Sequence, residues 1–194
     1  MRILKVKKQG LSKLAKEVVK TIQEGSVVIC PTDTVYGLIG DATNKKAVNK
    51  LFKIKKRSKR KPIPIFVKDI KMAKRFAKID KKQEKFLKKV WPGAVTAVLK
   101  SKKGKNTIGI RIPQYKLLLG LAEQLKVPLA ETSANISGKP ASTRIKEVLK
   151  QFTLQRGSGQ ENQPDLVIDA GNLKKSRPST VIDLTVLPPK ILRI

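Results

Sequence analysis

The chain has 194 residues, a length typical of one domain, and 40% of them are apolar, which excludes global disorder. It contains no histidine, which excludes a Ser-His-Asp mechanism and histidine-ligated zinc, and its single cysteine, Cys30, excludes an internal disulfide and is expected as a buried structural thiol. The 44 lysines and arginines against 14 acidic residues give a net charge of +30, which predicts attraction to polyanions such as nucleotides and nucleic acid, with a merely solvated basic surface as the alternative.

The first half of the chain alternates strand-like and helix-like patterns. Apolar residues spaced by three and four predict a helix that begins near Leu11 and ends at Gly25. Strands are expected on either side of this helix, at 2–7 and 26–30. Two prolines within 62–67 place a further strand at a sheet edge or at the strand's own start. Cap residues predict three more helices, namely one over 45–56 after Asn44 and one each after Asp69 and Asp80.

The second half continues this alternation and decides the fold class. Strands are expected at 94–100, 107–112, 127–131, 166–168, 180–184 and 190–194. Helices are expected around 117–125 and after a cap at Ser142 or Thr143, and the polar, glycine-rich segment 155–164 is typical of a mobile loop. We therefore predict a single α/β domain over 1–194, with a mixed sheet because several connections are too short for parallel crossovers.

Three polar segments stand at the ends of predicted strands, at 31–38, 55–62 and 132–143. The first reads Pro31-Thr32-Asp33-Thr34-Val35-Tyr36-Gly37-Leu38 and follows an apolar strand that Pro31 cannot extend. Because open α/β sheets bind ligands at the carboxyl ends of strands, this segment is predicted to form one wall of a substrate site. The Lys55-x-Arg57 spacing in the second segment is expected by chance in so lysine-rich a chain, and alone it indicates only a solvated helix end.

Taken together and in order, these segments resemble the YrdC/Sua5 family of threonylcarbamoyl-AMP synthases. The resemblance runs from about residue 10 to 194 and is closest to the short, single-domain branch. It rests on Pro31 to Leu38, Lys55-x-Arg57 with Lys61-Pro62, Trp91-Pro92-Gly93-x-x-Thr96, Arg111-x-Pro113, Thr132-Ser133-Ala134-Asn135-x-Ser137-Gly138 and Ser179-Thr180-Val181-x-Asp183. It implies a YrdC-like α/β fold, a twisted open mixed sheet flanked by helices around a basic cavity. The implied reaction makes L-threonylcarbamoyladenylate and pyrophosphate from L-threonine, bicarbonate or CO2, and ATP.

The resemblance also implies roles for individual residues. The catalytic and ATP-binding K-x-R and S-x-N motifs fall on Lys55, Arg57, Ser133 and Asn135. Further ATP-side positions match Lys61, Thr143 and Arg193. The threonine side matches Thr32, Thr34, Tyr36, Arg111 and Ser179, with Arg111 placed to meet the substrate carboxylate. Lys55 and Arg57 are expected to neutralise carbamate and phosphate charge from a polar helix end.

Some features depart from the family or lie outside its motifs. Phe66 and Tyr115 stand where the family often has histidines, and Phe66 cannot hydrogen-bond the substrate. The segment 155–164 matches a variable region over the family's cavity and is expected to act as a lid. Mg2+ is expected to arrive with ATP rather than in an acidic cage; Asp33 is the nearest candidate carboxylate, with capping of its own turn as the alternative.

The implied partners are ATP, L-threonine, bicarbonate and a threonylcarbamoyl transferase complex that modifies adenosine 37 of tRNA, with direct contact to tRNA or double-stranded RNA left open. No apolar stretch approaches the ~20 residues of a membrane span, and the first residues lack a signal-peptide pattern, so a cytoplasmic protein is expected. Two alternatives remain: a protein of the same fold that binds double-stranded RNA or ribosomes without making adenylate, and a carbamoyl-adenylate domain of hydrogenase maturation, whose accompanying zinc-finger modules this sequence does not contain.

Overall fold

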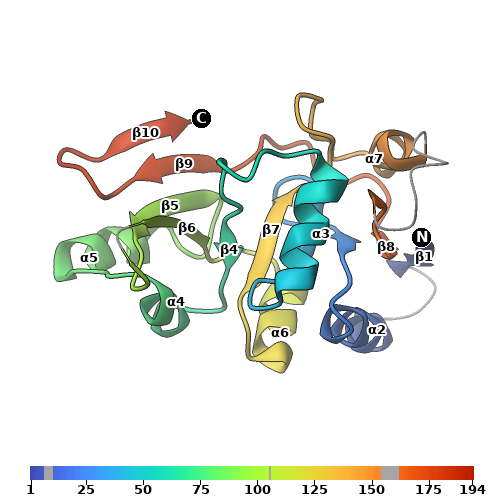
Figure 1. The fold of residues 1–194 in the computed structure, drawn as a ribbon, viewed down its shortest axis with the longest axis horizontal. Coiled ribbons are helices and arrows are strands. Elements are labelled where there is room, and N and C mark those ends of the chain that lie inside the picture. The colour runs from blue at the N-terminus through green and yellow to red at the C-terminus, as the bar shows by residue number, and fades with distance from the viewer. Residues whose placement is uncertain (7–10, 105, 154–161) are drawn as a thin grey trace.

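The computed structural model describes residues 1–6, 11–104, 106–153 and 162–194. These residues form one ten-stranded sheet in the order β1-β8-β2-β3-β7-β4-β6-β5-β9-β10 (Figure 1). The strands are β1 (Arg2–Lys5), β2 (Val28–Cys30), β3 (Gly37–Asp41), β4 (Ile65–Phe66), β5 (Val95–Lys100), β6 (Thr107–Arg111), β7 (Leu129–Ser133), β8 (Leu166–Asp169), β9 (Thr180–Asp183) and β10 (Lys190–Arg193). The helices are α2 (Leu11–Gln23), α3 (Lys45–Lys55), α4 (Ile70–Phe76), α5 (Lys81–Val90), α6 (Lys116–Leu125) and α7 (Ile145–Thr153). The α/β class is confirmed.

The sheet is mixed, as the short connections predict. The parallel neighbours are β1 with β8, β2 with β8, β4 with β6, and β5 with β9. The remaining neighbours run antiparallel, including β7, which joins β3 to β4 in the middle of the sheet.

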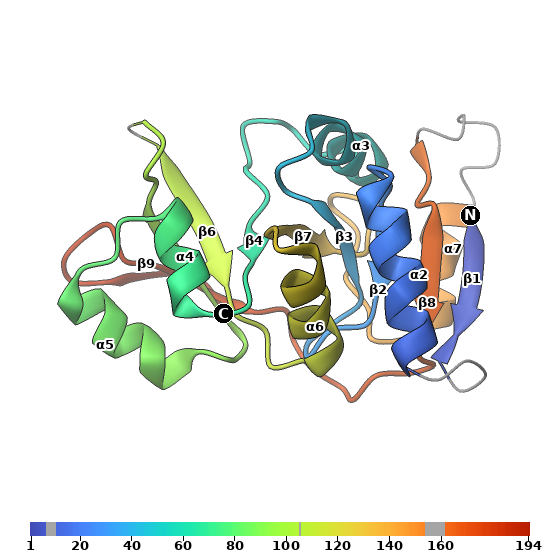
Figure 2. The same ribbon diagram turned by 90° about the horizontal axis from the view of Figure 1, so that it is seen from below.

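Helices cover both faces of the half of the sheet that contains β2, β3 and β7. One face carries α2 and α6, and the other carries α3 and α7 (Figure 2). The first pair packs against Ile39 and Leu129, and the second pair packs against Leu38 and Ala130. Alternate residues of a strand point to opposite faces, which is why neighbours in sequence enter different cores.

In the other half of the sheet, helices cover one face. There α4 and α5 pack against Ala97 and Ile110, and Ile110 lies opposite Ile65, which in turn lies opposite Ala130. These helices therefore share the face of α3 and α7. The opposite face of β5 and β6 carries no helix within the described ranges, and the candidate site lies there.

Local sequence signals account for the helix starts. Asn44 accepts from the backbone of Lys46 and Ala47, and Asp69 accepts from Met72. Asp80 and Gln83 form a reciprocal capping box. Ahead of α7 the hydroxyl of Ser142 accepts from the backbone of Arg144 (2.9 Å), the residue before the helix, and donates to Glu147 in its first turn (2.5 Å).

One strand was missed, and one of the two positions predicted for another strand was wrong. The strand β3 was missed because Gly37 and Gly40 lower the strand propensity of 37–41, yet β3 pairs with β2 on one side and β7 on the other. The segment 62–67 is not an edge: only Ile65 and Phe66 form β4, inside the sheet between β7 and β6, and both prolines precede the strand. The other predicted position, with the prolines at the start of the strand, is confirmed.

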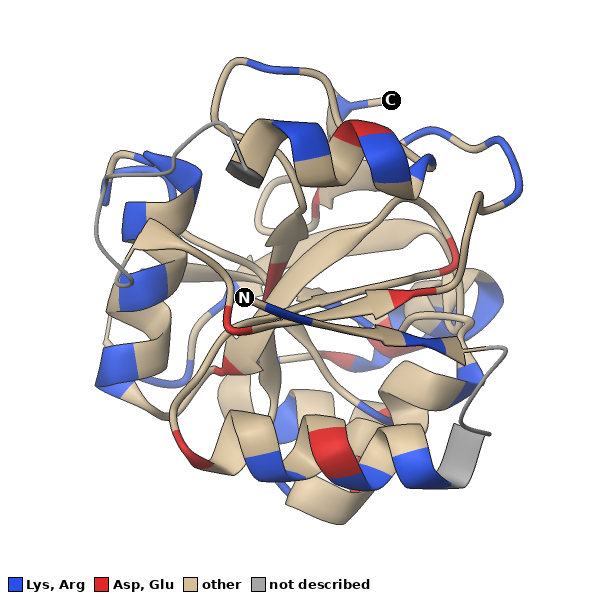
Figure 3. Cartoon of the chain, turned by 90° about the vertical axis from the view of Figure 1, so that its right-hand side faces the viewer, with Lys and Arg blue, Asp and Glu red and all other residues tan. Residues whose placement is uncertain are grey.

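Basic residues are distributed over the fold rather than confined to one part of it. Figure 3 shows Lys and Arg on helices around several sides of the sheet. Within the residues that the structure describes, no helix is both long enough and apolar enough to cross a membrane. Most of the predicted lid 155–164, namely residues 155–161, lies outside the described residues.

Candidate functional site

A cavity of about 350 Å³ opens on the face of the sheet that α4 and α5 leave free. Its wall comes from β7, β6, β5 and β9, whose alternate residues share this face. The wall is completed by β10 and by the polar segment 31–38, which we call the opening loop. The polar and charged lining residues are Thr34, Arg57, Thr96, Thr107, Arg111, Glu131, Thr132, Ser133, Ser179 and Arg193. Segments far apart in the sequence therefore supply one polar wall.

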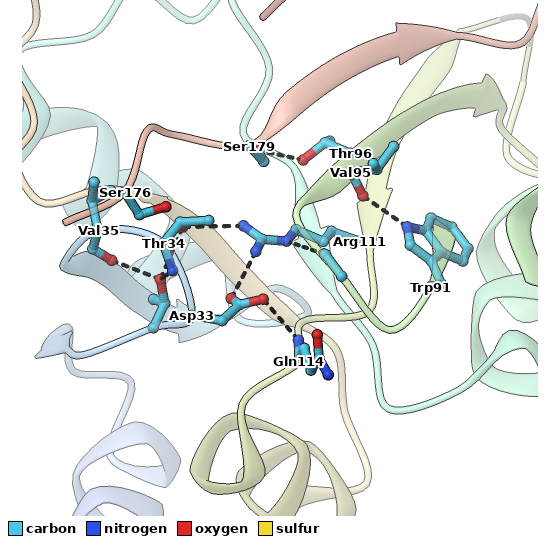
Figure 4. A network of polar contacts seen from close by, with 12 residues as sticks. Asp33, Thr34, Val35, Trp91, Val95, Thr96, Arg111, Gln114, Ser176 and Ser179 are labelled. Carbon is cyan, nitrogen blue, oxygen red and sulfur yellow. Dashed lines mark hydrogen bonds and ion pairs between the residues drawn. The ribbon is translucent and has the colours of Figure 1, made fainter. Parts of the chain in front are cut away.

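Arg111, at the end of β6, is the largest fully buried side chain in the described part of the molecule. Its Nη1 donates to Thr34 Oγ1 (3.3 Å) and its Nη2 to Asp33 Oδ1 (2.7 Å) (Figure 4). Its Nε donates to Gly93 O (2.8 Å), and the guanidinium lies 5.4 Å from the centre of the Phe66 ring. A guanidinium has five N–H groups, so two remain for a ligand.

Asp33 is engaged with Arg111 rather than capping its own turn. Its second oxygen accepts from the backbone N–H of Gln114 (2.9 Å), so both carboxylate oxygens are used. Asp33, the nearest candidate carboxylate for Mg2+ in the sequence, therefore has both oxygens engaged within the protein. The described residues contain no group of three or more acidic or cysteine side chains suited to a metal ion.

Of the three residues of the opening loop that were predicted to contact threonine, one lines the cavity. Thr34 lines the cavity, whereas Thr32 is buried beneath it, where its hydroxyl donates to Val35 O (2.7 Å) and accepts from Thr34 N (3.0 Å). Tyr36 is fully buried outside the cavity lining, and its hydroxyl donates to Gly171 O (2.7 Å) and accepts from Ala170 N (3.1 Å). Thr32 and Tyr36 thus shape the loop and hold it to the chain after β8.

Lys55 is buried at the end of α3, with 3% of its surface exposed, so the expectation of a polar, solvated helix end was wrong for this residue. Its ammonium donates to Ser133 O (2.6 Å), Ser133 Oγ (3.0 Å) and Asn135 Oδ1 (2.5 Å). Burial lowers the pKa of Lys55 to about 8, an effect that nearby Arg57 and Arg193 reinforce and Glu131 opposes. All three ammonium donors orient the 133–135 turn.

Arg57 stands at the junction of the cavity with a second, smaller groove of about 270 Å³. The groove is lined by Lys55, Arg57, Ser58, Lys61, Ser133, Asn135, Ser137 and Gly138. Arg57 and Ser133 line both spaces. Arg57 is held in place because its guanidinium donates to Lys61 O (2.8 Å) and Pro62 O (3.1 Å), and burial together with Arg193 lowers its pKa.

The far wall of the cavity joins β5, β9 and β10. Ser179 and Thr96 share a hydrogen bond between their hydroxyls (2.9 Å), and Arg193 Nη2 donates to Ser179 O (2.7 Å). Ser179 and Arg193, predicted for opposite substrates, are therefore neighbours. Thr143 lines neither the cavity nor the groove.

The comparisons with known proteins agree with this architecture. A family model described as Sua5/YciO/YrdC, telomere recombination, matches residues 20–194. The chain belongs to the Sua5/YciO/YrdC family. A relative from Methanocaldococcus jannaschii is 37% identical over 190 residues, which is 95% of this chain and 86% of that one. A threonylcarbamoyl-AMP synthase from Pyrococcus abyssi is 35% identical over 181 residues, and the match covers 89% of this chain and 51% of that one.

Solved structures of the Sua5/YciO/YrdC family show the same fold. Sua5 of P. abyssi complexed with L-threonine superposes with a TM-score of 0.86 at 32% identity, over 100% of this chain and 57% of that chain. YciO of E. coli superposes with a TM-score of 0.83 at 25% identity, over 99% of this chain and 93% of that chain. The present chain spans about half to three fifths of the P. abyssi protein.

The two residues expected to replace family histidines, Phe66 and Tyr115, both pack into the core. Phe66 is buried under Arg111, where its ring face contributes to holding the guanidinium. Tyr115 is half-buried against the core formed with α2 and α6, and burial raises the pKa of its phenol. Neither residue lines the cavity. Cys30 is fully buried in β2, and burial raises the pKa of its thiol, in keeping with a structural role.

The family motifs also left polar cavity residues unnoticed, among them Thr107 of β6 and Glu131, the glutamate of β7. Glu131 lines the cavity, and burial raises its pKa to about 7, against the opposing effects of Arg111, Lys55 and Arg193. The sequence signal that could have revealed it is a single acidic residue directly after the apolar run from Val127 to Ala130.

Glu131→Gln is expected to raise the stability of the fold at neutral pH. A carboxyl group whose pKa is higher in the folded state stabilises the fold below its unfolded pKa and loses that contribution as the pH rises through the folded value. The shift of the pKa from 4.5 to about 7 makes the wild-type chain lose up to about 3 kcal/mol across this window. Urea unfolding at pH 4.5 and 8 should show near-equal stabilities at the lower pH and a more stable variant at the higher pH; equal stabilities at both would contradict the shift.

Tyr36→Phe is expected to reduce stability with little effect on catalysis. The substitution removes a buried hydroxyl and leaves Gly171 O and Ala170 N without their partner, which costs about 1–3 kcal/mol. Chemical denaturation would measure the loss. A selective rise in the KM for a substrate, with stability unchanged, would instead place the phenol in the substrate site.

Proposed function

We propose that this chain is an L-threonylcarbamoyladenylate synthase, which joins L-threonine, bicarbonate or CO2, and ATP and releases pyrophosphate. The observation that carries the proposal is the meeting of the cavity and the groove at Arg57 and Ser133. Two substrates bound in adjoining spaces would have their reacting ends at this junction. The relative from P. abyssi is a threonylcarbamoyl-AMP synthase, and Sua5 of P. abyssi forms a complex with L-threonine, which supports the same interpretation.

The cavity suits threonine. The two unused N–H groups of Arg111 can bind the substrate carboxylate, and the hydroxyls of Thr34 and Ser179 lie on the same wall. A guanidinium already held by Asp33, Gly93 and Thr34 needs no reorganisation on binding, which favours a defined orientation of the amino acid.

The groove suits the phosphates of ATP. Lys61 and Arg57 provide positive charge, and the side chains of Ser133 and Asn135 provide polar groups along the same groove. Mg2+ would enter with ATP as part of the substrate, since the Asp33 carboxylate is already occupied.

The chemistry at the junction needs cations more than a base. The amine of threonine and CO2 give a carbamate, whose oxygen attacks the α-phosphorus of ATP as the bond to pyrophosphate breaks. Both reactants are anionic, so their repulsion is the main obstacle, and preorganised cations such as Arg57 and Lys55 reduce it. This explains how a chain without histidine can carry out the reaction.

Downstream, the adenylate would supply a transferase complex that modifies adenosine 37 of tRNA. The net charge of +30 could aid contact with tRNA, and it also favours the alternative of a protein that binds double-stranded RNA. The spread of Lys and Arg over several sides of the fold gives that alternative no defined binding face (Figure 3).

Omission of single substrates separates the two functions. Pyrophosphate release should require ATP, L-threonine and bicarbonate together, and the product should carry both AMP and the threonylcarbamoyl group by mass spectrometry. Salt-sensitive RNA binding without any threonine-dependent pyrophosphate release would overturn the synthase and favour the RNA-binding alternative.

A further inference from the structure

Glu131 is a carboxylate in a cationic cavity, yet its side chain has no partner among the described residues. Its backbone N–H donates to Pro64 O (3.0 Å), which fixes the strand. Its carboxylate makes no hydrogen bond or ion pair with any other described residue, although it lines the cavity beside Arg111 and Ser133. A partly buried carboxylate without a partner is costly and suggests that a ligand completes it.

The cations that act on Glu131 are all engaged elsewhere. Arg111 of β6 pairs with Asp33, Lys55 of α3 donates to the 133–135 turn, and Arg193 of β10 donates to Ser179. Asp33, in the opening loop, is the nearby acid that disfavours the charged form of Glu131. The cavity therefore offers one carboxylate in need of a cation and, at Arg111, N–H groups in need of an anion. A zwitterionic α-amino acid supplies both charges.

The opening loop leaves room for this carboxylate. A Cβ added to Gly37 would lie 2.8 Å from Glu131 Oε1 and 3.3 Å from Thr32 Cγ2. Gly37 faces Ser133 across the β3–β7 ladder, so its lack of a side chain keeps the space beside Glu131 open. The glycine of the loop and the glutamate of β7 are thus linked by geometry.

We propose that Glu131 binds the α-ammonium group of L-threonine and accepts one of its protons, an assignment that rests on the proposed synthase function. The proton moves from the ammonium nitrogen to a carboxylate oxygen, leaving a neutral amine and a carboxylic acid. The nitrogen lone pair then forms the bond to the carbon of CO2, and one C=O electron pair moves onto oxygen. The second proton of the nitrogen leaves to water, the carbamate remains, and Glu131 returns its proton to water before the next turnover.

The pH dependence of catalysis provides a specific readout. With its pKa raised to about 7, Glu131 titrates near the working pH, where a proton acceptor is most effective. The charged groups that face it are Arg111, Lys55, Arg193 and Asp33. In Glu131→Gln, kcat/KM for threonine should fall about 100-fold or more above pH 8 and approach the wild-type value below pH 6. The ratio of the two proteins cancels the titrations of threonine and carbonate, which both share.

Two further variants sharpen the comparison. Glu123→Gln removes an equal charge from an exposed acid of α6 that pairs with Lys68 outside the cavity, and it should match the wild type at every pH. Gly37→Ala should displace the Glu131 carboxylate and raise the KM for threonine while leaving the KM for ATP unchanged. A ratio of wild-type to Glu131→Gln activity that stays constant across pH would overturn the proton-accepting role.

Calorimetry tests the binding role without relying on turnover. The wild-type chain should bind L-threonine at least about 10-fold more tightly than 2,3-dihydroxybutanoate, which has a hydroxyl in place of the ammonium, and Glu131→Gln should lose this preference. Equal preference in both proteins would overturn the assignment. If the wild-type chain shows the binding preference but releases no pyrophosphate in response to threonine, the proposed synthase function is overturned instead.

Discussion

Replacing Lys55 with alanine should lower the rate of pyrophosphate release by about 10²–10³-fold. The ammonium holds Ser133 through two contacts and Asn135 through one, so its loss frees both side chains that line the groove and removes a buried positive charge. The structure also makes Lys55 a structural residue. Because Ser133 O and Asn135 Oδ1 would lose a charged donor, we expect stability to fall by about 1–3 kcal/mol. Rates and urea unfolding should be measured on the same preparations.

Arg57→Ala is the matched comparison. Arg57 is only half-buried and donates to two carbonyls of its own loop, so its removal should reduce the rate strongly while changing stability little. If Lys55→Ala retains activity within about tenfold of the wild type while remaining folded, the 133–135 turn does not depend on the ammonium and the groove is wrongly assigned.

Arg111→Ala should destabilise the fold by about 3–5 kcal/mol, a larger effect than any other substitution considered. The side chains of Arg111 and Asp33 are 2% and 12% exposed, and removing one partner leaves a buried charge uncompensated. For a chain of this length the loss corresponds to a fall in Tm of about 6–20 °C. Thermal and urea unfolding at one pH would measure it.

The control for Arg111→Ala is the loss of an ion pair on the surface. Lys68 contacts Glu123 at 2.6 Å, but the two side chains are 34% and 64% exposed, so Lys68→Ala should cost less than about 1 kcal/mol. A similar, small loss for Arg111→Ala would mean that Asp33 reaches water in the variant and that the buried pair does not fix the cavity wall.

The starts of the helices could be predicted from the sequence because they depend on local contacts. Asn44, Asp69 and Asp80 cap helices because their side chains act on backbone groups two or three residues away, which a linear pattern records. The strand β3 was not predicted because its two glycines have low strand propensity. It is stabilised by pairing with β2 on one side and β7 on the other.

The site was recognised by motif, but several roles required the structure. Lys55 looked solvated within a run of charges, although it lies four residues after the buried Leu51 on the same helical face. The pairing of Asp33 with Arg111 joins residues 78 apart in sequence, so no local pattern could reveal it. Glu131 lies between recognised motifs, and its role depends on the cations that the fold gathers around it.

The most direct test of a site formed by the adjoining cavity and groove is a crystal structure with L-threonine and a non-hydrolysable ATP analogue. We expect the threonine carboxylate on Arg111, the nucleotide phosphates in the groove with Lys61 and Asn135, and the α-phosphate beside Arg57 and Ser133. Density for the nucleotide elsewhere on the protein, with the groove empty at saturating concentration, would contradict the account.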